Sequence, residues 1–259
     1  MSFEKELHVA QLAARRAAAN ALRIQSGAGF HAESKADLSP VTQADKEGEK
    51  IIAGLLNEVF PEDGILGEEG SASDSNSGRK WIIDPIDGTR DFVRGNHLWC
   101  VLIGLEGEDR ETKAGVAYFP ILDQMWIAAR GLGAYRNHTR IHCSNKTSAS
   151  DSVLMVNIGN KIAHRADSAK WVEFLGKFWA FRSLGGAQDA MMVSAGQADL
   201  WIEPKAEPWD FAAIQVISEE AGATYTTLKG TRSIYDGSAV VYAPGLEPEV
   251  SAFLASVRV

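Results

Sequence analysis

Cysteine is scarce in this sequence. The 259 residues include only Cys100 and Cys143, which lie far apart and outside any C-x-x-C pattern. This scarcity excludes a disulfide framework and a cysteine-rich zinc cluster, and it predicts a protein of the reducing cytoplasm. Cys100 falls in an apolar run, so we interpret it as a core thiol rather than as a nucleophile.

Long hydrophobic runs are also missing. No segment approaches the about 18 consecutive apolar residues of a membrane-spanning helix. Residues 1–6 carry neither the basic region nor the apolar stretch of a secretory signal peptide. We therefore expect a cytoplasmic protein that has no membrane partner.

The chain has no excess of basic charge. Lys and Arg number 26 against 34 Asp and Glu, a net charge of −8, which argues against a nucleic acid or an anionic membrane as the main partner. A small phosphorylated substrate stays open, because bound divalent cations reverse the local charge of an acidic site. The 45% hydrophobic and 23% charged residues are typical of a globular protein, and we expect one domain over residues 1–259.

What the chain does contain is an apolar run that leads into two carboxylates. Residues 81–92 read Trp-Ile-Ile-Asp-Pro-Ile-Asp-Gly-Thr-Arg-Asp-Phe, which predicts a buried strand that delivers its acidic end into a turn. Asp84 and Asp87 would repel each other there unless a cation lay between them, so the pattern indicates a metal site. The alternative is an Asp-Pro turn with a capping Asp.

Other acidic positions have a structural interpretation beside the functional one. Thr42 is a plausible N-cap of a helix, and Asp45 completes its capping arrangement. Glu68 and Glu69 follow a short apolar run, and paired Glu residues at a loop entry are often solvated. Asp210 opens a helical pattern and could serve only as its N-cap.

Hydrophobic spacing predicts alternating helices and strands along the chain. Helices are expected over residues 3–23, 42–60, 167–178, 188–195, 210–221 and 247–257, and strands over 65–67, 81–83, 99–105, 114–119, 124–129, 153–157, 199–204, 224–228 and 239–242. Residues 71–78 are predicted to form a mobile surface loop near the site, and residues 131–135 a turn. His138 and His142 lack a third ligand nearby, which disfavours a metal role.

Three motifs together resemble the signature of the inositol monophosphatase family: Gly67-Glu68-Glu69, Asp84-Pro85-Ile86-Asp87-Gly88-Thr89 and Trp209-Asp210-x-Ala212-Ala213. This family belongs to the magnesium-dependent, lithium-sensitive phosphatases, with the fructose-1,6-bisphosphatases and the 3′-phosphoadenosine 5′-phosphate phosphatases. The resemblance implies an α/β fold, a layered αβαβα sandwich, and a homodimer. Most metal ligands would lie in an N-terminal half, about residues 1–145, and the substrate-side residues in a C-terminal half, about 146–259.

The resemblance also implies a set of metal ligands. A first Mg²⁺ would be held by Glu68, Asp84 and the carbonyl of Ile86, a second by Asp84, Asp87 and Asp210, and a third, weaker ion would lie near Glu69. Carboxylate and carbonyl oxygens are what such a hard cation takes.

Phosphate and water contacts are implied in the same way. Gly88 and Thr89 would give backbone N–H groups to the phosphate at a helix N-terminus. Thr89 would pair with Asp45, and with Glu68 it would orient and deprotonate the attacking water. Two cations would neutralise the phosphate oxygens and stabilise the departing alkoxide, so no covalent intermediate is needed.

Substrate residues divide between two branches of the family. Arg182, Gly186, Ala187 and Glu203 fall where the family lines its substrate pocket, and Glu203 where inositol enzymes contact ring hydroxyls. Phe92-Val93-Arg94-Gly95, Trp99 and Pro208-Trp209-Asp210-Phe211 look similar to histidinol-phosphate phosphatases. Asp189 and Glu207 could receive the cationic amine of histidinol phosphate, or be solvated helix charges.

The sequence thus predicts a Mg²⁺-dependent phosphomonoesterase that acts on a small phosphorylated polyol or amino alcohol, inositol 1-phosphate or histidinol phosphate. A nucleotide 3′-phosphatase is a weaker alternative, because no adenine pocket is evident. The other alternative is a non-catalytic binding or regulatory homologue, against which the intact set of acidic residues argues.

Overall fold

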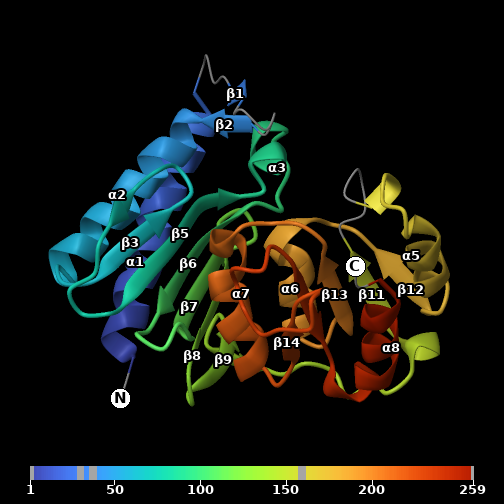
Figure 1. The fold of residues 1–259 in the computed structure, drawn as a ribbon. Coiled ribbons are helices and arrows are strands. Elements are labelled where there is room, and N and C mark those ends of the chain that lie inside the picture. The colour runs from blue at the N-terminus through green and yellow to red at the C-terminus, as the bar shows by residue number, and fades with distance from the viewer. Residues whose placement is uncertain (1–2, 28–31, 35–39, 157–161, 258–259) are drawn as a thin grey trace.

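Residues 64–141 contribute the strands of a large mixed sheet (Figure 1). The computed structural model describes residues 3–27, 32–34, 40–156 and 162–257. The strands of this sheet run in the order β10-β9-β8-β7-β6-β5-β3-β4, and all neighbours are antiparallel except the parallel pair β3 and β5. Their bounds are β3 (Gly64–Gly67), β4 (Ala72–Ser73), β5 (Lys80–Asp87), β6 (Cys100–Glu106), β7 (Thr112–Phe119), β8 (Gln124–Ala129), β9 (Gly133–Arg136) and β10 (Thr139–Ile141). A separate two-stranded sheet joins β1 (Ala32–Ser34) and β2 (Pro40–Thr42).

Two long helices cover one face of the large sheet. These are α1 (Glu4–Gln25), rich in buried alanine, and α2 (Gln43–Val59), which buries Ile52 and Leu56. Successive strand residues point to opposite faces. Trp81 and Ile83 of β5 pack in the cluster with α1 and α2, whereas Ile82 packs in the cluster on the other side. The strand is buried on both faces, and its alternating side chains contribute to the two core layers in turn.

The other face of this sheet lies against α7 (Pro208–Glu220) and α6 (Gly186–Ser194). The approach of α7 is close, since a Cβ at Gly104 would come within 2.6 Å of the Ala212 Cβ, and one at Gly115 within 2.6 Å of Val216 Cγ1. Glycine in β6 and β7 thus allows the helix that carries Asp210 to lie directly on the sheet.

A second sheet covers the far side of α6 and α7. Its strand order is β12-β11-β13-β15-β14, from β11 (Val153–Val156), β12 (Ala180–Arg182), β13 (Leu200–Glu203), β14 (Thr224–Thr226) and β15 (Ala239–Tyr242). An outer cluster joins this sheet to α5 (Ser168–Leu175) and α8 (Glu247–Val257), where Phe174 stacks on Phe253. The structure also has the short helices α3 (Thr89–Val93), η1 (Ala149–Asp151) and η2 (Pro244–Leu246).

The layers therefore follow the order helices, sheet, helices, sheet, helices. The three hydrophobic clusters fill the spaces between them, with α6 and α7 as the shared middle layer. The α/β prediction of an αβαβα sandwich is confirmed.

Most predicted elements are present, and some boundaries are wrong. Strands β8 and β15 and helix α8 have the predicted bounds. The segment 71–78 is not wholly a loop, because Ala72–Ser73 pair with β3 as an edge strand. The predicted turn at 131–135 gives way to β9 from Gly133, and position 157 lies outside the described residues. Among the helices of the described residues, none has the length and apolar character needed to cross a membrane.

Candidate active site

The two aspartates of the central motif lie inside β5 rather than after it. Pairing with β6 is interrupted between Asp84 and Asp87, where Pro85 has no N–H to donate. The Asp84 side chain steadies this bulge, because its Oδ1 accepts the Ile86 N–H at 2.9 Å. Bulges next to active sites change the direction in which side chains point. The predicted strand over residues 81–83 is therefore too short, because β5 continues through both buried aspartates to Asp87.

Asp210 reaches the same place from the other side of the sheet. It is the third residue of α7 and not its N-cap; the cap is Glu207, whose backbone N–H donates to Asp210 Oδ2 at 2.6 Å. One carboxylate oxygen from each of Asp84, Asp87 and Asp210 lies within 4.8 Å of the others. Such a cluster fits a hard divalent cation, which takes several carboxylate oxygens at once.

The electrostatics of this cluster point the same way. Burial, followed by the nearby carboxylates of Glu68, Asp87 and Asp210, raises the pKa of Asp84 well above its usual range. Burial raises the pKa of Asp210 as well, with Asp87 the next largest cause. For Asp87, burial raises the pKa to about 6 although the Ala187 N–H opposes the shift. Like charges held together in this way are relieved by a cation or by protons.

Glu68 joins the cluster from the loop after β3. Its backbone N–H donates to the Ile83 carbonyl at 3.1 Å, which ties the loop to β5. Its carboxylate lies close enough to that of Asp84 to raise the pKa of Asp84. Glu69, next along this loop, is partly exposed. The parallel pairing of β3 with β5 explains why Glu68 and Asp84 meet although they are separated in sequence.

Asp45 and Thr89 lie together, as the resemblance implies. Asp45 Oδ2 accepts the N–H of Thr42 at 2.8 Å and its hydroxyl at 2.6 Å, so the predicted capping box at the start of α2 is present. The second oxygen of Asp45 lies 3.2 Å from Thr89 Oγ1, which also lies 3.1 Å from the Ile86 carbonyl. One carboxylate therefore serves both the helix cap and the threonine.

Backbone geometry around the cluster depends on two glycines. Gly88 has φ 86° and directly precedes α3, a left-handed conformation that disfavours other residues. Gly186 has φ 51°, and a Cβ there would lie 2.4 Å from Asp87 Oδ2. The next residue, Ala187, donates its N–H to that same oxygen at 2.8 Å. The start of α6 thus contacts the cluster through its backbone.

The remaining substrate-side candidates differ in burial and in their distance from the acidic cluster. Glu203 ends β13, is buried, and is close enough to raise the pKa of Asp87, Asp189 and Asp210. Arg182 is exposed on the edge strand β12, where its guanidinium donates to the Phe181 carbonyl.

Asp189 and Glu207 differ from each other in their surroundings. Asp189 is fully buried, so its interpretation as a solvated charge is wrong. Its two oxygens accept the N–H groups of Leu184 and Gly185 at 3.1 and 3.2 Å, and burial raises its pKa to about 6. Glu207 is exposed at the start of α7.

Sequence reasoning missed Glu49, which is buried on α2 and accepts two backbone N–H groups from the Glu68 loop. The signal was its spacing, four residues after Asp45 on the same helix, which places both carboxylates on one face.

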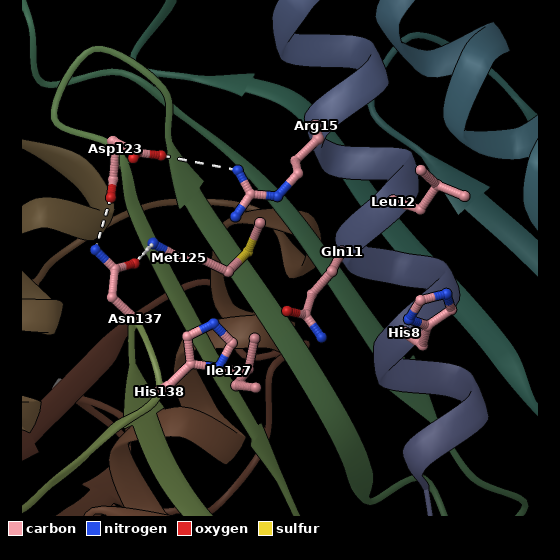
Figure 2. A pocket seen from close by; sticks show the side chains of 9 residues that line it. All are labelled: His8, Gln11, Leu12, Arg15, Asp123, Met125, Ile127, Asn137 and His138. Atoms are coloured by element: carbon pink, nitrogen blue, oxygen red, sulfur yellow. Dashed lines mark hydrogen bonds and ion pairs between the residues drawn. The ribbon is translucent and has the colours of Figure 1, made fainter.

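A hollow of about 520 Å³ lies elsewhere, between α1 and the β8–β9 region (Figure 2). Arg15 within it faces Asp123 at 3.7 Å, and both side chains are largely exposed. Its lining includes a single carboxylate. We therefore assign the chemistry to the acidic cluster at β5.

Known proteins are similar to this chain over most of its length. The family model described as "Inositol monophosphatase family" matches residues 4–258. The chain belongs to the inositol monophosphatase family. A histidinol-phosphatase of Mycobacterium tuberculosis is 35% identical over 235 residues, which cover 88% of this chain and 90% of that relative. An inositol-1-monophosphatase of Bacillus subtilis is 37% identical over 194 residues, 73% of each protein.

Solved structures of the family have the same fold. The Thermotoga maritima inositol monophosphatase superposes with a TM-score of 0.86 at 28% identity and covers 98% of both chains. The family resemblance read from the three motifs is confirmed, and the protein is a phosphoric monoester hydrolase of this family.

Proposed function

We propose that this protein is a Mg²⁺-dependent phosphatase that releases phosphate from a small phosphorylated amino alcohol or polyol, with histidinol phosphate as the first candidate. The observation that carries the proposal is the convergence of Asp84, Asp87 and Asp210 within 4.8 Å, with the Glu68 carboxylate near enough to raise the pKa of Asp84. Histidinol phosphate comes first because the histidinol-phosphatase relative matches over 88% of this chain.

The residues of the chain divide the work of hydrolysis between them. Asp84, Asp87, Asp210, Glu68 and the Ile86 carbonyl would hold two Mg²⁺ ions, and Glu69 would lie near a third. When bound, these ions would supply charge neutralisation at the phosphate and a lowered pKa for water.

Other groups act on the water and the phosphate. Thr89 Oγ1, held by Asp45, would orient the attacking water, and Glu68 would accept its proton. Backbone N–H groups of Gly88 and Thr89 would bind the phosphate. The attack would be in line and would not form a covalent intermediate with the protein.

Inositol 1-phosphate is the second candidate. The buried Glu203 at the end of β13 favours it, because a carboxylate beside the cluster can accept hydrogen bonds from ring hydroxyls. Arg182, Gly186, Ala187, Asp189 and Glu207 are proposed to line the rest of the substrate side.

The test is phosphate release from histidinol phosphate, inositol 1-phosphate and 3′-phosphoadenosine 5′-phosphate, each with Mg²⁺ and with EDTA. A preference for histidinol phosphate supports the proposal and makes Asp189 and Glu207 the first candidates for amine recognition. A preference for either other substrate replaces that assignment. Absence of metal-dependent release from any phosphomonoester would show a non-catalytic homologue.

We also propose a cytoplasmic homodimer. Both cysteines are free thiols, which suits a reducing compartment. Strand β12 lies at the edge of the second sheet; its Phe181 is 48% exposed, and Trp179 and Leu184 on either side of the strand are 74 and 41% exposed. An edge strand flanked by exposed apolar side chains is a surface for pairing with a second chain. Analytical ultracentrifugation of the wild type and of Phe181→Lys tests this, and a monomeric wild type would refute it.

A further inference from the structure

Helix α2 presents three successive contacts to the loops that carry the candidate active-site residues. Asp45 approaches Thr89, as described above. One turn further on, a Cβ at Gly48 would lie 3.2 Å from the Pro85 Cβ, so the helix packs directly on the bulge of β5 next to Asp84. The next residue, Glu49, is only 2% exposed although no step of the proposed hydrolysis uses it.

The Glu49 carboxylate binds the loop after β3 with both oxygens. Oε2 accepts the Glu69 N–H at 2.6 Å, and Oε1 accepts the Ser71 N–H at 2.7 Å. The loop is closed by its own bond from the Gly67 N–H to the Ser71 carbonyl at 2.8 Å. Two short N–H···O bonds to one carboxylate are stronger than ordinary neutral pairs. Glu49 therefore fixes the two loop amides that flank Gly70.

The Glu49 carboxylate packs so closely against the loop that a side chain at Gly67 would collide with it. A Cβ added at Gly67 would lie 2.3 Å from Glu49 Oε2. Glu68, the next residue, is tied on its other side to the Ile83 carbonyl. The loop is thus held from α2 and from β5 at once, with Glu68 between the two attachments.

We propose that Glu49 is a positioning residue, which sets the loop so that the Glu68 carboxylate meets Asp84 at the metal site. This inference rests on the proposed function, because the role of Glu68 belongs to it. Helix α2 then positions two groups that act on the water: Thr89 through Asp45, and Glu68 through Glu49.

The test compares Glu49→Gln with Glu58→Gln, a matched change at an exposed position of the same helix. Glu49→Gln replaces one acceptor by an NH₂ group that faces a loop N–H. We expect it to lower kcat, or to raise the Mg²⁺ concentration for half-maximal rate, by about 10–100-fold, as the loss of groups that support metal ligands does. KM should change less than either quantity, and Glu58→Gln should match the wild type.

A purely structural role would give a different pattern. Circular dichroism and thermal unfolding establish whether Glu49→Gln is folded at the assay temperature. A folded Glu49→Gln protein with wild-type kcat and wild-type Mg²⁺ dependence would overturn the inference, even if its melting temperature were lower. If Glu49→Gln does not fold, Gly67→Ala disturbs the same contact while it keeps the carboxylate, and the same changes are expected.

Direct calorimetric titration with Mg²⁺ separates this inference from the proposed function. A wild type that neither binds Mg²⁺ nor releases phosphate refutes both. A wild type that does both, beside a folded Glu49→Gln that binds Mg²⁺ equally well and turns over equally fast, refutes only the role of Glu49.

Discussion

Asp84 is constrained by burial, by a backbone hydrogen bond and by neighbouring carboxylates. It is buried in the middle of a sheet, it accepts the Ile86 N–H, and its carboxyl group is close to three others. A buried charge without compensation is costly, and such a residue persists only where its charge is used. The raised pKa of Asp84 is therefore a functional signal as well as an electrostatic one.

Asp84→Asn should lower kcat by on the order of 10² or more, because an amide in place of this carboxylate would remove negative charge from the proposed metal site. The fold should persist, since Asn Oδ1 can still accept the Ile86 N–H. Steady-state kinetics with Mg²⁺ and circular dichroism check this. Asp74→Asn, on the exposed segment beside β4, is the control and should be fully active. Near-wild-type turnover by a folded Asp84→Asn protein would contradict the two-metal assignment.

Glu203→Gln should alter the choice of substrate more than the affinity for Mg²⁺. Glu203 borders the cluster from β13, so the change affects hydrogen bonding on the substrate side. We expect the ratio of kcat/KM between inositol 1-phosphate and histidinol phosphate to shift by about 10-fold or more. An equal loss on both substrates would count against a substrate contact.

At the level of elements, hydrophobic period and turn chemistry predicted the helices and strands but not the ends that matter for the site. Strand β5 runs through Asp87 because a bulge lets both aspartates stay in the sheet, and a bulge leaves no periodic signal. Asp210 was predicted to be an N-cap but is the third helical residue of α7. Pro208 suits the first helical turn, and Glu207 is the N-cap. The contacts of Glu49 could not be predicted, because its partners are backbone N–H groups, which every residue other than proline has.

The β9–β10 hairpin carries its own strain. Arg136 pairs with Thr139, so Asn137 and His138 form a two-residue turn, with φ of 46° and 68°. Such a turn prefers glycine at its second position. Asn137 is suited to the first, since its amide accepts the Met125 N–H and donates to the Asp123 carbonyl (Figure 2).

His138→Gly should therefore stabilise the protein by about 0.5–1 kcal/mol, the left-handed cost of a side chain less the extra freedom of glycine in the unfolded chain. Asn137→Gly is the paired variant and should destabilise, because two hydrogen bonds worth about 0.5–1.5 kcal/mol each are lost. Urea unfolding of both variants measures this. Equal effects of the same sign would refute the strain argument.

The whole fold was predictable because three motifs identify the family, and family membership sets the layer order. The packing of α7 on the first sheet was not predictable from local patterns. It depends on Gly104 and Gly115 letting α7 approach β6 and β7, a contact between residues about a hundred positions apart. Separations of that kind leave no periodic trace in one sequence.

Stability of the whole molecule should depend on Mg²⁺ and pH together. The raised pKa values of Asp84, Asp87 and Asp210 mean that the metal-free fold holds protons that the unfolded chain has released. Asp87 therefore destabilises the metal-free fold as pH rises from about 4 through about 6, and the raised pKa values of Asp84 and Asp210 act in the same direction. Mg²⁺ needs the ionised carboxylates, so its stabilising effect should be present at pH 8 and mostly lost at pH 5.

At a Mg²⁺ concentration about 100-fold above Kd the gain is about 2.7 kcal/mol, which corresponds to a Tm increase of roughly 5–10 °C at pH 8. Differential scanning calorimetry at pH 5 and pH 8, with Mg²⁺ or EDTA, measures it. A Tm increase of the same size at both pH values would contradict the link to these carboxylates.

The position of α7 between the two sheets has one more consequence. Asp84 and Asp87 belong to the first sheet, whereas Asp210 arrives on a helix shared with the second. If the chain were divided between β10 and β11, neither piece would contain all three of these aspartates. Phosphate release would then report the reunion of the two pieces, and the bound ion would act as a latch between them. The fold is in this sense a ready template for a split-enzyme sensor.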